Sequence, residues 1–280
     1  MGSDIPIYFE LSWSILSSIC LFECLISIAV IKLYGKSSVM LVPLVVSIAG
    51  AIANGLCYYA YYSDYEATGR LVAAAFADYF WLIQEAGLSV YSYQILQNIL
   101  QGRRLKIYFS LYWSILFVVV IIRTLICVNR IQLLKGDNSK IETINDFHSA
   151  YFTCIAIVEL INAYFLIETF GQKTAFRSAE FFNIILKSSE FRLACLFLIG
   201  LSRAITYSFQ ASAQSASNVP GQLDRFVYTL ECLYPFAMIV DNLVGKISAK
   251  NITAINSCSA KSKPANGKAS IIASATAEEC

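Results

Sequence analysis

The sequence predicts an all-α, polytopic membrane protein, a bundle of about seven transmembrane helices with the N-terminus outside the cytosol and the C-terminus inside it. Two features of the composition predict this class, because 57% of the 280 residues are hydrophobic and only 14% are charged. An ordinary soluble domain has about 45–50% and about 25%. The third observation is that apolar runs of about 20 residues, the length that crosses a hydrocarbon core, recur along the chain. The lipid bilayer is therefore the first partner that the sequence predicts.

Seven apolar stretches are long enough to be spans. In chain order they are Phe9–Ile31, Val39–Tyr61, Leu71–Leu96, Ile107–Val128, Phe147–Phe170, Phe191–Gln210 and Phe226–Lys246. The N-terminal segment MGSDIPIYFE lacks the basic region and the cleavage site of a signal peptide, so we expect the first span to be retained. The first, fourth and sixth spans are the clearest. The third and fifth carry more polar residues and are predicted mainly from their length and flanks.

The basic residues between the spans predict the orientation, because Lys and Arg accumulate on the cytosolic side of a membrane. Thirteen of them fall in the loops and the C-terminal segment on one side, and five fall on the other side. The five are Arg70, Arg130, Lys135, Lys140 and Arg225. We therefore expect residues 1–248 to form the transmembrane domain with its C-terminal end in the cytosol.

The C-terminal segment differs in composition from the rest of the chain. Residues 249–280 are rich in Ser, Ala, Asn and Lys and show no apolar period, which predicts a disordered cytosolic tail. Asn251 begins an Asn-Ile-Thr glycosylation sequon. On a cytosolic tail this asparagine would stay unmodified, so a glycan there would overturn the predicted orientation.

Composition also excludes several kinds of site. A formal net charge of +2, with the basic residues spread through short loops, does not favour nucleic-acid binding. The nine cysteines include no Cys-x-x-Cys pair, and His148 is the only histidine. We therefore expect no zinc site, no other metal site and no disulfide framework, and nothing in the sequence calls for a cofactor.

Ionisable residues inside the expected spans are the most informative ones. A charge at the bilayer centre costs about 2.5–3.5 kcal/mol even on lenient scales, so we expect these side chains to face the bundle interior. The eight residues are Glu23, Asp78, Glu85, Arg123, Glu159, Arg203, Glu231 and Asp241. They comprise six acids and only two arginines. Because Asp78 and Glu85 are seven residues apart, they share one face of their helix.

Two interpretations of this set remain open. In the first, Arg123 and Arg203 pair with two of the carboxylates and fix the packing of the helices. In the second, carboxyl groups line a cavity that binds a ligand or performs acid chemistry. The candidate catalytic acids are then Glu85, Glu159 and Glu231. The candidate residues of the binding cavity are Asp78, Arg123, Arg203 and Asp241.

The last two expected spans resemble those of a known group. The stretches SSEFRLACLFLIGLSRAITYSFQ (Ser188–Gln210) and GQLDRFVYTLECLYPFAMIVDNLVGK (Gly221–Lys246) are similar to fungal integral membrane proteins of secondary-metabolite gene clusters, including indole-diterpene mycotoxin clusters. The resemblance implies a part in terpenoid biosynthesis at the endoplasmic reticulum or another internal membrane. It also implies an apolar terpenoid substrate and other pathway enzymes as partners.

The sequence does not decide whether the protein is an enzyme. Small membrane-bound terpene cyclases in such clusters usually place an acid in the second span, beside an aromatic residue, and the span Val39–Tyr61 has none. The resemblance therefore transfers no catalytic residue, and either an accessory or a cyclase-like step remains open. The alternative is a seven-helix receptor or small-molecule transporter, for which a plasma membrane location also fits.

Overall fold

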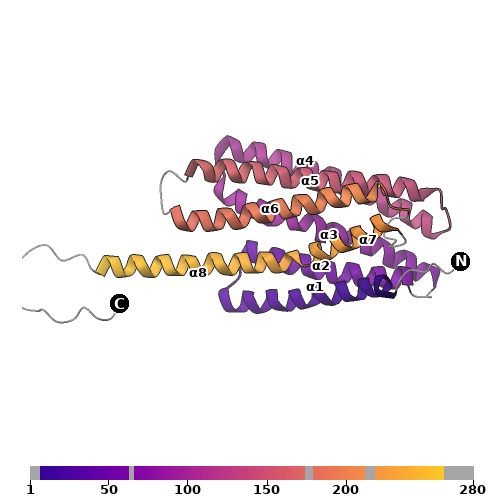
Figure 1. The fold of residues 1–280 in the computed structure, drawn as a ribbon, viewed down its shortest axis with the longest axis horizontal. Coiled ribbons are helices and arrows are strands. Elements are labelled where there is room, and N and C mark those ends of the chain that lie inside the picture. Colours follow the sequence, from indigo (N-terminus) through magenta and orange to yellow (C-terminus); the bar gives the residue numbers. More distant parts are fainter. Residues whose placement is uncertain (1–6, 63–65, 174–178, 212–217, 262–280) are drawn as a thin grey trace, which may run out of the picture.

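The computed structural model describes residues 7–62, 66–173, 179–211 and 218–261, and in these ranges the chain forms helices and no strand. The helices are α1 (Ile7–Tyr34), α2 (Ser38–Tyr62), α3 (Ala67–Ile99), α4 (Gly102–Leu134), α5 (Lys140–Lys173), α6 (Ala179–Tyr207), α7 (Val219–Cys232) and α8 (Tyr234–Lys261). They run side by side along one axis (Figure 1). The predicted all-α bundle is confirmed.

Six stretches of the described chain are long and apolar enough to cross a membrane. They are Ser12–Tyr34, Ser38–Tyr61, Ala67–Ile99, Gly102–Leu134, Lys140–Thr169 and Val219–Ile247. The side chains of α6 are described only from Arg192 onward. An integral membrane protein of the helical class follows from these lengths, whereas the count of seven spans and the orientation stay predictions.

Most helices are longer than the expected spans, and this corrects several placements, two of which concern buried arginines. Arg130, expected in a loop, lies inside α4, and Arg225, also expected in a loop, lies inside α7. Both side chains are buried. The physical reason is that backbone hydrogen bonding continues beyond the ends of the apolar run, so hydropathy alone makes the expected span too short. At the other end of the domain, α8 continues past residue 248 to Lys261.

The last expected span, Phe226–Lys246, is two helices. Pro235 has no N–H and its ring would collide with the carbonyl of Glu231, four residues earlier, so the regular hydrogen bonding of a helix is interrupted at this point. Instead α7 ends at Cys232, and the N–H of Leu233 donates to the Thr229 carbonyl at 3.2 Å. The break therefore falls at Leu233, two residues after Glu231.

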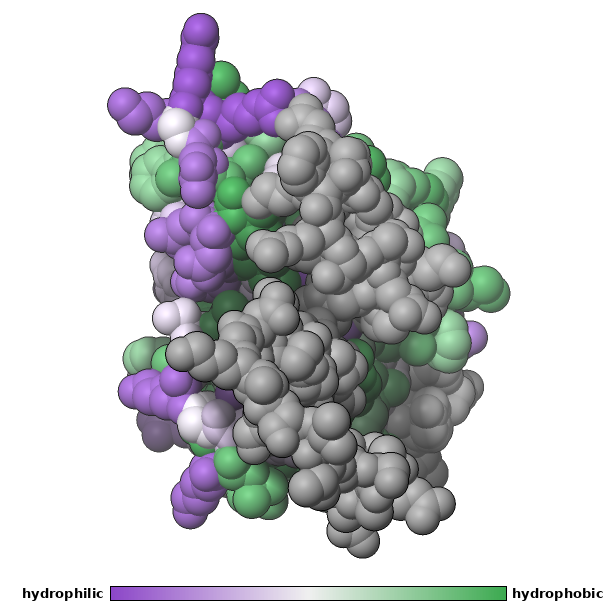
Figure 2. Space-filling model, turned by 90° about the vertical axis from the view of Figure 1, so that its left-hand side faces the viewer, coloured by the Kyte–Doolittle hydropathy of each residue, from purple (hydrophilic) through white to green (hydrophobic). Residues whose placement is uncertain are grey.

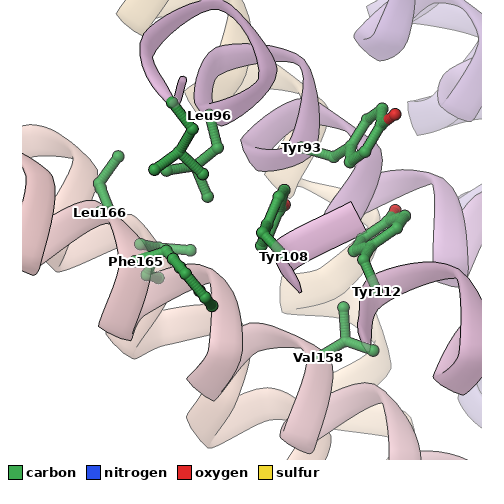
Figure 3. Packing of buried hydrophobic residues seen from close by; sticks show 9 residues of the cluster. Tyr93, Leu96, Tyr108, Tyr112, Val158, Phe165 and Leu166 are labelled. Carbon is green, nitrogen blue, oxygen red and sulfur yellow. The ribbon is translucent and has the colours of Figure 1, made fainter. Parts of the chain in front are cut away.

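Aromatic packing joins three neighbouring helices. Tyr93 of α3 stacks on Tyr112 of α4 with ring centroids 4.7 Å apart, and Tyr108 meets Phe165 of α5 at 5.2 Å (Figure 3). Apolar side chains such as those of Phe22 and Leu198 instead face outward. Large apolar residues outside and polar residues inside are the arrangement expected of a bundle whose solvent is lipid.

A small residue sets one close helix approach. A Cβ at Gly50 of α2 would lie 2.9 Å from Cys20 Sγ of α1 and 3.0 Å from Gln84 Cδ of α3. Real Cβ atoms do not come this close, so glycine lets the three helices pack at this level. Gln84, a buried polar residue of α3, therefore packs directly against α2.

Candidate functional site

Arg203 on α6 is the centre of a buried ion-pair network. Its Nη1 lies 2.8 Å from Glu85 Oε1 on α3 and 2.7 Å from Glu231 Oε2 on α7. Its Nε lies 3.1 Å from Asp224 Oδ1, also on α7. All four side chains are at most 8% exposed. One guanidinium thus connects three helices through three carboxylates.

A second set of contacts extends the network along α3 and α4. Arg123 Nη1 lies 3.2 Å from Glu85 Oε2, and its Nη2 lies 3.3 Å from Asp78 Oδ1. Arg130 Nη1 lies 2.6 Å from the same Asp78 oxygen. Glu85 and Asp78 therefore each bind two arginines. This arrangement compensates charges that would be costly in lipid when alone.

His148 on α5 lies beside Arg130, at the end of this set of contacts. Its Nδ1 lies 2.8 Å from the Ile144 carbonyl oxygen, which can only accept, so this nitrogen carries the proton. Its Nε2 lies 3.0 Å from Arg130 Nη2 and must accept. The imidazole is therefore neutral in this arrangement, and both of its nitrogens are used.

Aromatic rings surround the guanidinium groups. Arg203 Cζ lies 3.9 Å from the ring centroid of Phe152 and 4.8 Å from that of Tyr228. Arg123 Cζ lies 5.0 Å from the centroid of Tyr151. A cation over a ring face is attracted by the ring quadrupole, more strongly where water is excluded. The rings therefore stabilise the arginines in addition to the carboxylates.

Asp241, expected in the same cavity, lies elsewhere. Its Oδ2 pairs with Arg192 Nη1 at 2.5 Å, in a contact between α8 and α6. Glu23 of α1 is also separate, with its Oε2 3.5 Å from the Ser47 hydroxyl oxygen. The structure thus brings together Asp78, Glu85, Arg123, Arg203 and Glu231 from the expected set and leaves Asp241 and Glu23 apart.

Glu159 on α5 differs from the other two candidate acids, because it makes no ion pair among the described residues. Its Oε2 lies 3.4 Å from Asn162 Nδ2, and Tyr108 donates its hydroxyl to Asn162 Oδ1 at 2.8 Å. Glu85, Glu159 and Glu231 nevertheless line one cavity of about 10 Å³. That is the space of a single water molecule. The three candidate catalytic acids therefore meet around a site large enough for one water.

A larger cavity opens between α2, α3 and α4. It holds about 350 Å³, and its wall is apolar apart from Ser38. The lining residues are Ser38, Leu41, Val42, Val45, Val46, Leu82, Ile83, Ala86, Gly87, Val90, Leu116 and Val120. We call this cavity the lateral cleft. Val45, Ile83 and Val120 are 38–50% exposed on the lipid-facing surface, so the cleft opens sideways toward the hydrocarbon.

Several buried charged residues do not stand out in the sequence. The expected ratio of six acids to two arginines is wrong, because Arg130, Arg192 and Arg225 are buried as well. Arg225 Cζ lies 3.5 Å from the centroid of Trp13 and its Nη1 donates to Ser12 Oγ. One signal was available, since residues 78 and 85 are spaced like residues 123 and 130. Equal two-turn spacings of opposite charge predict a ladder between two helices.

Comparison with family models, with curated proteins and with solved structures finds no match for this chain. The resemblance to fungal secondary-metabolite proteins and the roles of the candidate acids therefore stay predictions. The helix lengths and the charges buried at the centre of the bundle identify the chain as an integral membrane protein of the α-helical class.

Proposed function

We propose that the protein is an accessory membrane protein of terpenoid secondary metabolism, which holds an apolar isoprenoid intermediate within the bilayer. The observation that carries this proposal is the lateral cleft between α2, α3 and α4. Its volume of about 350 Å³ falls in the range of about 300–1,000 Å³ that is usual for small-molecule sites. An isoprenoid dissolves in the hydrocarbon and would enter such a cleft sideways, without crossing water.

The contacts that the candidate carboxylates make favour a role in ligand binding over a role in acid catalysis. Both oxygens of Glu85 contact arginines, and Glu231 Oε2 contacts Arg203. The cavity that they share with Glu159 has room for one water and not for an isoprenoid. A general acid must come within hydrogen-bond reach of the atom it protonates. The first of the two sequence interpretations, in which arginines pair with carboxylates, therefore supports an accessory role.

The metabolic setting of the proposal comes from the sequence. The stretches Ser188–Gln210 and Gly221–Lys246 resemble proteins of fungal secondary-metabolite clusters. That resemblance favours an internal membrane such as the endoplasmic reticulum and pathway enzymes as partners. The alternative, a seven-helix receptor or small-molecule transporter, stays a prediction that the lateral cleft does not favour.

Filling the lateral cleft should abolish isoprenoid binding. Val120→Trp places an indole in the cleft wall, whereas Val118→Trp adds the same group on the same helix outside the cleft. Two residues turn an α-helix by about 200°, so the two positions face different ways. With the full chain in nanodiscs and tritiated geranylgeraniol as probe, we expect Val120→Trp to lower affinity at least about tenfold, about 1.4 kcal/mol. Equal binding by the two variants would contradict the proposed site.

The metabolic role is tested separately with the same pair. In a fungal host that carries the surrounding biosynthetic genes, Val120→Trp should lower the amount of the terpenoid end product and Val118→Trp should leave it unchanged. Both variants are followed by immunoblotting to show equal amounts of protein. Unchanged metabolites in both strains would contradict the metabolic role and leave the binding result standing.

A further inference from the structure

A second groove lies on the outer surface between α4 and α5, away from the network and from the lateral cleft. It holds about 520 Å³. Its lining residues are Arg104, Ile107, Leu111, Ile157, Leu160, Ile161, Tyr164, Phe165 and Glu168. Leu160 and Tyr164 are 49% and 63% exposed, so the groove is open along its length. We call it the α4–α5 groove.

The length of this groove corresponds to one leaflet of a bilayer. Its wall on α5 runs from Ile157 to Glu168, which at 1.5 Å per residue is about 16 Å. The hydrocarbon core of a bilayer is about 30 Å thick, so one leaflet contributes about 15 Å. The apolar wall ends at the charged residues Arg104 and Glu168. The length of the apolar wall therefore matches the distance between the end of an acyl chain and its headgroup.

The polar end of the groove is basic. Arg103, Arg104 and Lys106 are all exposed in the first turns of α4, and no acidic residue lies in its first turn. The nearby acid is Glu168, which pairs with Arg104 at 3.2 Å. The Arg104 side chain is 49% exposed and that of Glu168 is 28% exposed, so water weakens their ion pair and Arg104 can turn to another anion. Figure 2 looks onto this end of the bundle and shows hydrophilic residues along its upper rim.

We propose that the α4–α5 groove binds one anionic glycerophospholipid, with an acyl chain along Ile107, Leu111 and Leu160 and the phosphate at Arg104. Basic side chains between transmembrane helices recognise anionic headgroups, because each Lys or Arg near the surface contributes to the attraction. The apolar wall alone would accept any lipid. Arg104 in the groove, together with the positive charge that Arg103 and Lys106 add at the same end of α4, selects the anionic ones.

The test is lipid retention by the full chain, measured by native mass spectrometry after purification in nanodiscs of phosphatidylcholine with added phosphatidylserine. We expect phosphatidylserine to be retained at least about tenfold over phosphatidylcholine, a preference lost when Arg103, Arg104 and Lys106 are changed to Gln. Leu160→Trp, which fills the apolar wall, should lower retention of both lipids. Glu168→Gln removes the competing acid and should raise the preference.

Matched controls separate the groove from general membrane charge. The double change Lys135→Gln and Lys140→Gln removes two cations at the opposite end of α4 and α5. Leu198→Trp adds an indole at an exposed position of α6. Both should retain phosphatidylserine like the parent chain. Equal retention of the two phospholipids, or the same loss in the controls, would overturn the proposal. Displacement of phosphatidylserine by inorganic phosphate alone would overturn the lipid assignment, since it shows a soluble anion site.

Discussion

Replacing Arg203 by leucine should lower the free energy of unfolding by about 3–5 kcal/mol, which is the usual cost of removing one partner from a buried ion pair. The change leaves Glu85, Asp224 and Glu231 buried without the guanidinium that all three contact. It also removes the cation that lies over the ring of Phe152. Unfolding by SDS in lipid–detergent micelles, followed by circular dichroism, measures this loss.

Two further variants keep the result for Arg203 interpretable. Arg203→Lys retains the charge but cannot present the planar fork that reaches several carboxylates, so we expect an intermediate loss. Lys135→Gln removes an exposed cation and should leave the transition unchanged. An Arg203→Leu protein that unfolds at the same SDS fraction as the parent would show that the network does not hold the helices together.

Asp78→Asn should have the second largest effect, also about 3–5 kcal/mol. Asp78 is the carboxylate shared by Arg123 and Arg130, and an amide in its place removes the carboxylate that Arg130 contacts at 2.6 Å and one of the two that Arg123 contacts. The same unfolding experiment applies. If Asp78→Asn left the transition in place, the ladder between α3 and α4 would contribute nothing to stability.

Asp137→Asn is the matched control for Asp78. Asp137 lies in the exposed turn between α4 and α5, where the Ser139 hydroxyl donates to its Oδ1 at 2.6 Å. This hydrogen bond holds the pKa of the Asp137 carboxyl below its ordinary value. No buried cation depends on this carboxylate, so the Asn variant should unfold like the parent chain.

The helical class could be predicted from the sequence because hydropathy reports each span locally. The buried polar residues of the bundle could be predicted only in part. The position of each residue in its own span makes Glu85, Glu159 and Glu231 candidate acids, and the three do meet around one cavity. Arg130 and Arg225 were missed because they lie beyond the apolar runs, in helix ends that hydropathy does not detect. Their burial depends on which side chains other helices supply, which a single span does not reveal.

The break in the last span and the lateral cleft show two different limits of prediction from the sequence. Pro235 was visible in the sequence, and its missing N–H predicts an interruption after Glu231. The lateral cleft has no comparable signal, because it arises from the spacing of α2, α3 and α4 and not from any motif. Residues such as Ala86 and Val120 look like ordinary lipid-facing or packing residues until the helices are placed.

The most direct test of the central claim, that intramembrane carboxylates hold the helices together, is a double-mutant cycle between Glu85 and Arg203. Their charged atoms lie 2.8 Å apart. The unfolding free energies of Glu85→Gln, Arg203→Gln and the double variant are measured against the parent chain. We predict that the double variant loses less stability than the sum of the two single changes, with a coupling of about 1–3 kcal/mol. Additive losses, within about 0.5 kcal/mol, would contradict the claim.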